Sequence, residues 1–88
     1  MANSKSAEKR HRQSLKRRQR NRHYKSTMRT YIKRARKAIA EHPAQADEAV
    51  RKATAFVARV ASKGIIHRNT AARTISRLTR ALQRARQG

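Results

Sequence analysis

Apolar residues recur at helical spacing in three separate segments of the chain. From residue 24 to 39, from 46 to 60 and from 71 to 85, they follow one another at steps of mostly three and four positions. Such steps place apolar side chains on one face of a helix. The three stripes are Tyr24, Met28, Tyr31, Ala35 and Ala38, widened by Ile32 and Ile39; Ala46, Ala49, Val50, Ala53, Phe56, Val57 and Val60; and Ala71, Ile75, Leu78, Leu82 and Ala85.

The first break between these segments is Glu41-His42-Pro43. Proline disfavours helical geometry at the preceding residue and cannot continue a helix, but its fixed φ suits the opening position of the next one. Asp47 and Glu48 then lie near the positive end of the second helix, where carboxylates are stabilising. The sequence therefore predicts that one helix ends before Pro43 and another begins soon after it.

The second break is Lys63-Gly64. Glycine readily takes the left-handed conformation that ends many helices, and a lysine suits the last helical turn. Ile65 and Ile66 follow directly, and we expect them to fold back onto the core rather than stay exposed.

Three stripes joined by short turns predict an all-α fold, a three-helix up-down-up bundle. Many stripe positions are alanines, which bury little area each, so we expect a bundle of modest stability.

The first apolar stripe does not reach the N-terminus. Between Asn3 and His23 the apolar residues are Ala7 and Leu15 alone, yet no proline or glycine interrupts a helix there. We therefore predict one long first helix from about Ser4 to Glu41, whose N-terminal half projects from the bundle. At about 1.5 Å per residue, the projecting half reaches roughly 30 Å. This divides the chain into a basic projecting arm, 1–23, and a bundle, 24–88.

Charge indicates the role of the arm. The 88 residues include 25 Lys/Arg and four Asp/Glu, a net charge of +21. The stretch 9–25 holds nine Lys/Arg and no acidic residue. A solvated helix face usually mixes both signs, whereas like charges at these spacings repel and require a partner of dense negative charge. A nucleic-acid backbone is the usual one, and we expect the free arm to be frayed until phosphates neutralise it.

Catalytic, cofactor and metal sites find no support in the composition. There are no cysteines, and the only glycines are Gly64 and Gly88, so neither a thiolate site nor a glycine-rich phosphate loop exists. The four acidic residues suggest no converging pair, and no two histidines lie three or four positions apart. Neither an apolar signal region nor a stretch of about 20 apolar residues occurs, so we expect a cytoplasmic protein without membrane contact.

The aromatic residues allow two interpretations. Tyr24, Met28 and Tyr31 could form a platform on which unpaired bases stack, but their helical spacing favours packing against the core. With Phe56 as the one further aromatic residue, stacking is not expected to be the main mode of binding.

The segment 63–73 combines a structural turn with contact chemistry. His67, Arg68 and Asn69 stand beside the start of the third helix, whose free backbone donors attract anions. We interpret the segment as a glycine-capped turn that also touches phosphates.

Charge alone does not separate DNA from RNA. A basic zipper would need a long heptad-patterned helix, which Pro43 interrupts. A membrane-active helix would need an apolar face, which the arm lacks. A nucleoid-type DNA-binding protein remains the alternative. A long basic helix on a small bundle suits a cleft between folded RNA helices, where it would bind phosphates and 2′-hydroxyls.

Several motifs are distinctive when taken together. They are Met1-Ala2-Asn3 with Lys5-Ser6-Ala7 and Lys9-Arg10, Gln13-Ser14 with Lys16-Arg17-Arg18, Met28-Arg29-Thr30-Tyr31-Ile32-Lys33, and the whole of 63–73. Over essentially its whole length, the chain resembles the S-twenty family of bacterial small-subunit ribosomal proteins, and 63–73 is the strongest single signature.

The resemblance implies a three-helix structural constituent of the small ribosomal subunit, in its lower body. It implies direct binding of 16S ribosomal RNA, a role in its folding during assembly, few protein–protein contacts and no enzymatic activity. The RNA-binding residues it implies are Asn3, Lys5, Lys9, Arg10, Arg12, Lys16, Arg17, Arg18, Arg20, Arg22, Lys25, Arg29, Lys33, Lys63, His67, Arg68, Asn69, Arg73 and Arg77. Leu15 departs from the polar surroundings expected there and leaves open a local apolar contact.

Overall fold

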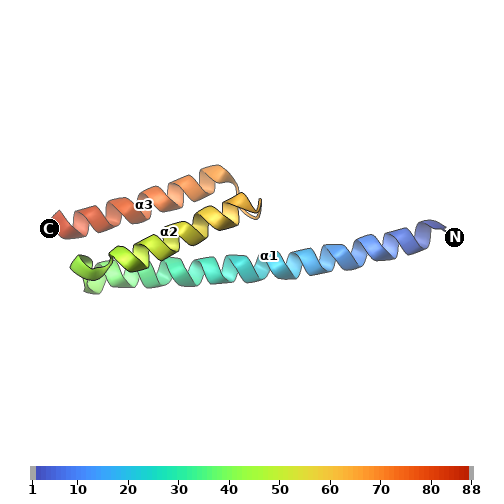
Figure 1. Cartoon of the computed structure of the whole chain (residues 1–88), viewed down its shortest axis with the longest axis horizontal. Coiled ribbons are helices and arrows are strands. Elements are labelled where there is room, and N and C mark those ends of the chain that lie inside the picture. The colour runs from blue at the N-terminus through green and yellow to red at the C-terminus, as the bar shows by residue number, and fades with distance from the viewer. Residues whose placement is uncertain (1, 88) are drawn as a thin grey trace.

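A computed structural model describes residues 2–87, with side chains from residue 5 onward. This part of the chain forms three α-helices, α1 (Ala2–Glu41), α2 (Asp47–Ser62) and α3 (Arg68–Gln87), and a short 3-10 helix, η1 (Pro43–Gln45). In Figure 1, α2 runs back along the C-terminal half of α1, and α3 returns beside α2. The expected all-α fold is confirmed, with α1 beginning two residues before the predicted start.

Both turns follow from the residues that form them. Pro43 opens η1 rather than α2, which begins only at Asp47, so the second helix starts later than the proline suggested. Gly64 takes the left-handed conformation, with φ of 76°. Its N–H donates to the Ala61 carbonyl at 2.9 Å, and the Ile65 N–H donates to the Val60 carbonyl at 3.2 Å. This pair of bonds is a Schellman motif, which satisfies carbonyls left free at the end of α2.

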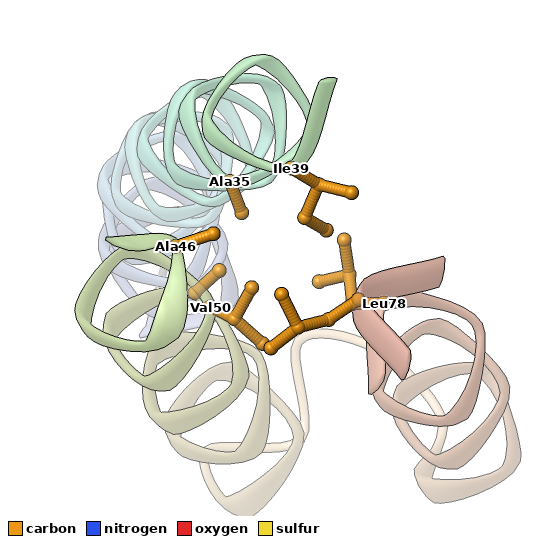
Figure 2. Packing of buried hydrophobic residues seen from close by; sticks show 7 residues of the cluster. Ala35, Ile39, Ala46, Val50 and Leu78 are labelled. Carbon is orange, nitrogen blue, oxygen red and sulfur yellow. The ribbon is translucent and has the colours of Figure 1, made fainter. Parts of the chain in front are cut away.

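The core lies on the axis between the three helices. Figure 2 shows Ala35 and Ile39 of α1 facing Val50 of α2 and Leu78 of α3. Leu78, Val57 and Val60 are the largest fully buried side chains.

Two expectations about the core need adjustment. Ile75, which belongs to the third stripe, is only half-buried, because it lies at the edge of the face whose centre Leu78 occupies. Ile65 and Ile66 are also half-buried, so they fold back only in part.

One polar contact joins elements that are far apart in the sequence. Arg86, near the end of α3, donates from Nε to the Pro43 carbonyl at 3.2 Å and from its terminal nitrogen to the Asp47 carboxylate. The hydrogen bond from Arg86 is the main cause that holds the pKa of Asp47 below its usual range. We call this contact the Arg86 clamp, because it fastens α3 to the turn between α1 and α2.

The molecule is long because α1 continues well past the bundle. Its extents are 68 × 21 × 13 Å, and its radius of gyration is 17.8 Å. A compact domain of this length would have a radius of gyration of about 12 Å. Every side chain from 5 to 20 is exposed. We use "arm" for residues 5–23 of α1 and "bundle" for residues 24–87.

Candidate nucleic-acid interface

The arm is basic around its whole circumference. Seven residues make nearly two helical turns, so Arg10 and Arg17 lie in line with Tyr24 and Tyr31, which face the bundle further along α1. Arg18, one residue on from Arg17, points to a different side. The arm therefore offers positive charge to partners on any side, in place of an apolar face.

All predicted arm residues whose side chains are described are exposed; Asn3 lies outside those residues. The exposed set is Lys5, Lys9, Arg10, Arg12, Lys16, Arg17, Arg18, Arg20 and Arg22.

In the bundle, the exposed Lys/Arg residues of α1 lie away from its packed face, and six of them form one stripe that begins at the end of the arm. This outer α1 stripe steps by four and three positions. Its ends are 18 residues apart, which is five full turns and about 27 Å. Its members, all exposed, are Arg18, Arg22, Lys25, Arg29, Lys33 and Arg36.

A second stripe follows the outer face of α3. Its four arginines step by four, three and four positions, and all are exposed. The stripe consists of Arg73, Arg77, Arg80 and Arg84.

Sequence reasoning missed three members of these stripes, Arg36, Arg80 and Arg84. The signal that could have found them is helical spacing, because they continue the steps of three and four positions that begin at predicted contact residues.

The second helix differs from the other two. Its 16 residues hold three Lys/Arg and two acidic residues, whereas the 40 residues of α1 hold 15 Lys/Arg and two acidic residues. Lys52 also lies 3.4 Å from Glu48, an exposed pair one turn apart. Positive charge is therefore concentrated on α1 and α3.

The turn between α2 and α3 brings Lys63, His67, Arg68 and Asn69, all exposed, to one corner. Within this corner, His67 has a role that the sequence did not show. Its Nδ1 accepts a hydrogen bond of 3.0 Å from the backbone N–H of Asn69, so His67 caps α3. One of the backbone donors predicted to cradle a phosphate is therefore already bonded.

The corner is fastened to α1 where the arm meets the bundle. The Lys63 ammonium lies 5.3 Å from the centre of the Tyr24 ring, a cation–π contact. The Tyr24 ring lies 6.3 Å from that of Phe56, and the Tyr31 ring lies 5.1 Å from it. The interpretation of Tyr24 and Tyr31 as packing residues is confirmed. Lys63 has Tyr24 as a partner within the chain, in addition to any anion that it binds.

Other chemistry is not visible in the described part of the chain. Among these residues, no group of three or more His, Asp or Glu side chains is placed to hold a metal ion. None of the helices formed by residues 2–87 is long and apolar enough to cross a membrane.

Comparison with known proteins agrees with the family expected from the motifs. A family model described as Ribosomal protein S20 matches residues 2–83. The small ribosomal subunit protein bS20 of Geotalea daltonii is 52% identical over 81 residues, which cover 91% of this chain and 93% of the relative. The protein of the same name from Alkalilimnicola ehrlichii is 51% identical over 84 residues, covering 94% and 96%. That of Desulforapulum autotrophicum is 48% identical over 82 residues, covering 93% and 99%.

Proposed function

The chain belongs to the ribosomal protein S20 family, and from this membership we propose that it binds 16S ribosomal RNA directly and stabilises the folded RNA during assembly. It is a structural constituent of the small ribosomal subunit and not an enzyme. Its place in the cell is therefore the ribosome, which in bacteria lies in the cytoplasm.

The observation that carries the proposal is the distribution of charge on α1. This one helix holds 15 Lys/Arg, and its arm has no apolar face to bury. Lysine and arginine that neutralise phosphates release counterions, and this release drives binding to nucleic acid. We assign the arm to charge neutralisation and the bundle to fixing the direction in which the arm points. With the terminal residues included, the two proposed parts of the chain are 1–23 and 24–88.

The α3 stripe and the corner supply further contacts in this proposal. Arginines at helical spacing suit successive phosphates, because each guanidinium can donate two parallel hydrogen bonds. The corner lies where the arm meets the bundle, so Arg68 and Asn69 would meet the same RNA that the arm binds.

A competition titration tests the proposal against binding by charge alone. A fluorescent fragment of 16S ribosomal RNA and unlabelled duplex DNA compete for the full chain at near-physiological salt. We expect a large excess of DNA to leave the RNA bound, because a helical arm whose direction the bundle fixes suits the shape of folded RNA. If DNA displaces the RNA on equal terms, only polycation binding of the nucleoid type is present, and the proposed recognition of 16S ribosomal RNA fails.

A further inference from the structure

A groove follows the seam between α1 and α2, and no described residue of α3 lines it. It consists of two adjoining hollows that share Tyr31 and Lys52. We call it the α1–α2 groove. The residues that line it are Tyr31, Arg34, Gln45, Glu48, Ala49, Lys52, Ala55, Phe56 and Arg59.

The floor of the groove is aromatic. Tyr31 and Phe56 are half-buried, their ring centres lie 5.1 Å apart, and their planes are inclined by 34°. Unpaired bases of RNA stack on such rings. The hollow that both rings line has a volume of about 290 Å³. The adjoining hollow, which Tyr31 lines without Phe56, has a volume of about 390 Å³, and pockets that hold small organic ligands begin at roughly 300 Å³.

The rim of the groove combines cations with two acceptors. Arg34, Lys52 and Arg59 are exposed around the aromatic floor. Lys52 is paired with Glu48 at 3.4 Å, so Arg34 and Arg59 are the cations that favour an anionic ligand most. Gln45 and Glu48 stand at one end. A carboxylate accepts hydrogen bonds from the exocyclic amino groups of adenine, cytosine and guanine, which uracil lacks.

The groove lies on the same side of α1 as part of the arm. Lys16 precedes Arg34 by 18 residues, which is five full turns, so both side chains leave the helix in the same direction. Lys16 and Arg20 line a hollow on the arm. An RNA strand that follows this side of the arm therefore leads to the α1–α2 groove.

We propose that the α1–α2 groove binds one unpaired nucleotide of the RNA held by the arm. The base stacks on Tyr31 and Phe56, and its neighbouring phosphates lie near Arg34, Lys52 and Arg59. The inference rests on the proposed RNA-binding function and adds recognition of one position in the RNA, which the basic stripes do not supply.

Two matched substitutions on α2 test the proposal. Ala55 and Ala58 are both exposed, and only Ala55 lines the groove. Ala55→Glu therefore places a negative charge at the site, and Ala58→Glu adds the same charge elsewhere on the helix. Each full-length variant is bound to 16S ribosomal RNA, whose unpaired bases are probed with dimethyl sulfate for adenine and cytosine and kethoxal for guanine.

We expect the unsubstituted chain and Ala58→Glu to protect one discrete unpaired base that Ala55→Glu leaves as reactive as in free RNA. The rest of the footprint should persist, with affinity lowered by on the order of tenfold, as for loss of one stacked base. Equal protection by both variants, or equal loss of the whole footprint, overturns the inference. Absence of any footprint with the unsubstituted chain instead overturns the proposed function.

A second variant tests the stacking itself. Tyr31→Leu keeps an apolar side chain against Phe56 but removes the ring. Circular dichroism first establishes that the variant is as helical as the unsubstituted chain. Exposure of the same base that Ala55→Glu exposes supports stacking, whereas protection unchanged from the original chain rules it out. If Tyr31→Leu unfolds, Arg59→Gln tests the cationic rim of the groove instead, because that side chain is exposed. Protection of the base unchanged by Arg59→Gln would then count against the groove as the binding site.

Discussion

The two halves of α1 form one continuous helix, but the half in the bundle has a buried apolar face and the half in the arm has an exposed basic surface. In the bundle, Ala35 is 0% exposed and Ile39 is 8% exposed, because α2 and α3 cover that face. In the arm, the only large apolar side chain is Leu15, and it is 45% exposed. One helix can therefore be packed along part of its length and unpacked along the rest while its backbone stays helical throughout. In the proposed function, the bundle supplies stability and the arm supplies binding.

This separation has a physical cost. The stretch 9–25 contains no acidic residue, so charges one turn apart repel, and no packed face compensates for them. In the proposed function, the phosphates of the RNA remove the repulsion. Substitutions in the arm should therefore change binding and leave unfolding unchanged, and substitutions in the bundle core should do the reverse.

The largest expected effect is the loss of stability caused by Leu78→Ala. Leu78 is 2% exposed at the centre of the core, so truncation leaves a cavity and lowers the free energy of unfolding by about 2–5 kcal/mol. At roughly 4–8 °C per kcal/mol for a domain of this size, the midpoint of thermal unfolding should fall by about 10 °C or more. Leu15→Ala is the matched control, and its midpoint should not move. Equal midpoints for the two variants would contradict the assignment of the core.

The next largest effect is the loss of RNA affinity when arginines of the arm are replaced. Replacing Arg17, Arg18 and Arg20 by Ala should weaken RNA binding by on the order of a hundredfold near physiological salt. The slope of log affinity against log salt should flatten by about 0.7–0.9 for each phosphate that the variant no longer neutralises. The same three positions changed to Lys keep the charge and should keep the slope. A lower unfolding midpoint for the Ala variant would show that the arm contributes to the bundle after all.

A smaller effect is expected at the edge of the core. Ile75 is half-buried, so Ile75→Ala should lower the free energy of unfolding by only about 1–2 kcal/mol, below the range for a fully buried site. Ile39→Ala, the same truncation at an 8% exposed position, should cost more. Chemical denaturation of both variants measures which substitution lowers the free energy of unfolding more. A larger loss for Ile75→Ala than for Ile39→Ala would place Ile75 inside the core.

The smallest effect concerns the Arg86 clamp and depends on pH. The pKa of Asp47 is lowered from its ordinary 3.8, chiefly by the hydrogen bond from Arg86, so the ionised form stabilises the fold. This stabilisation is complete when the pH lies above the ordinary pKa of Asp47. It is lost as the pH falls below that value and through the lowered pKa of the folded protein. Asp47→Asn should therefore lower the unfolding midpoint slightly at neutral pH and not at strongly acidic pH. If the unfolding midpoints of Asp47→Asn and the unsubstituted chain still differ in strong acid, the difference does not come from the Arg86 clamp.

Much of this architecture could be predicted from residues that act locally. Pro43 and Gly64 end helices because of their own backbone chemistry, and the apolar steps of three and four positions give each helix its packed face. Several motifs taken together, of which 63–73 is the strongest, indicated the family. The excess of Lys/Arg without acidic residues indicated a nucleic-acid partner for the arm.

The rest depends on which helix lies beside which. Arg86 reaches Pro43 and Asp47 across 39 or more positions, and Lys63 lies over Tyr24 across the same number, so no local pattern relates them. The α1–α2 groove exists only because Tyr31 and Phe56 meet at a helix seam. Periodicity gives the direction of a side chain around its own helix axis. The neighbour that it meets, and the choice of Leu78 over Ile75 for the centre of the core, are decided only when three helices pack at particular rotations and offsets.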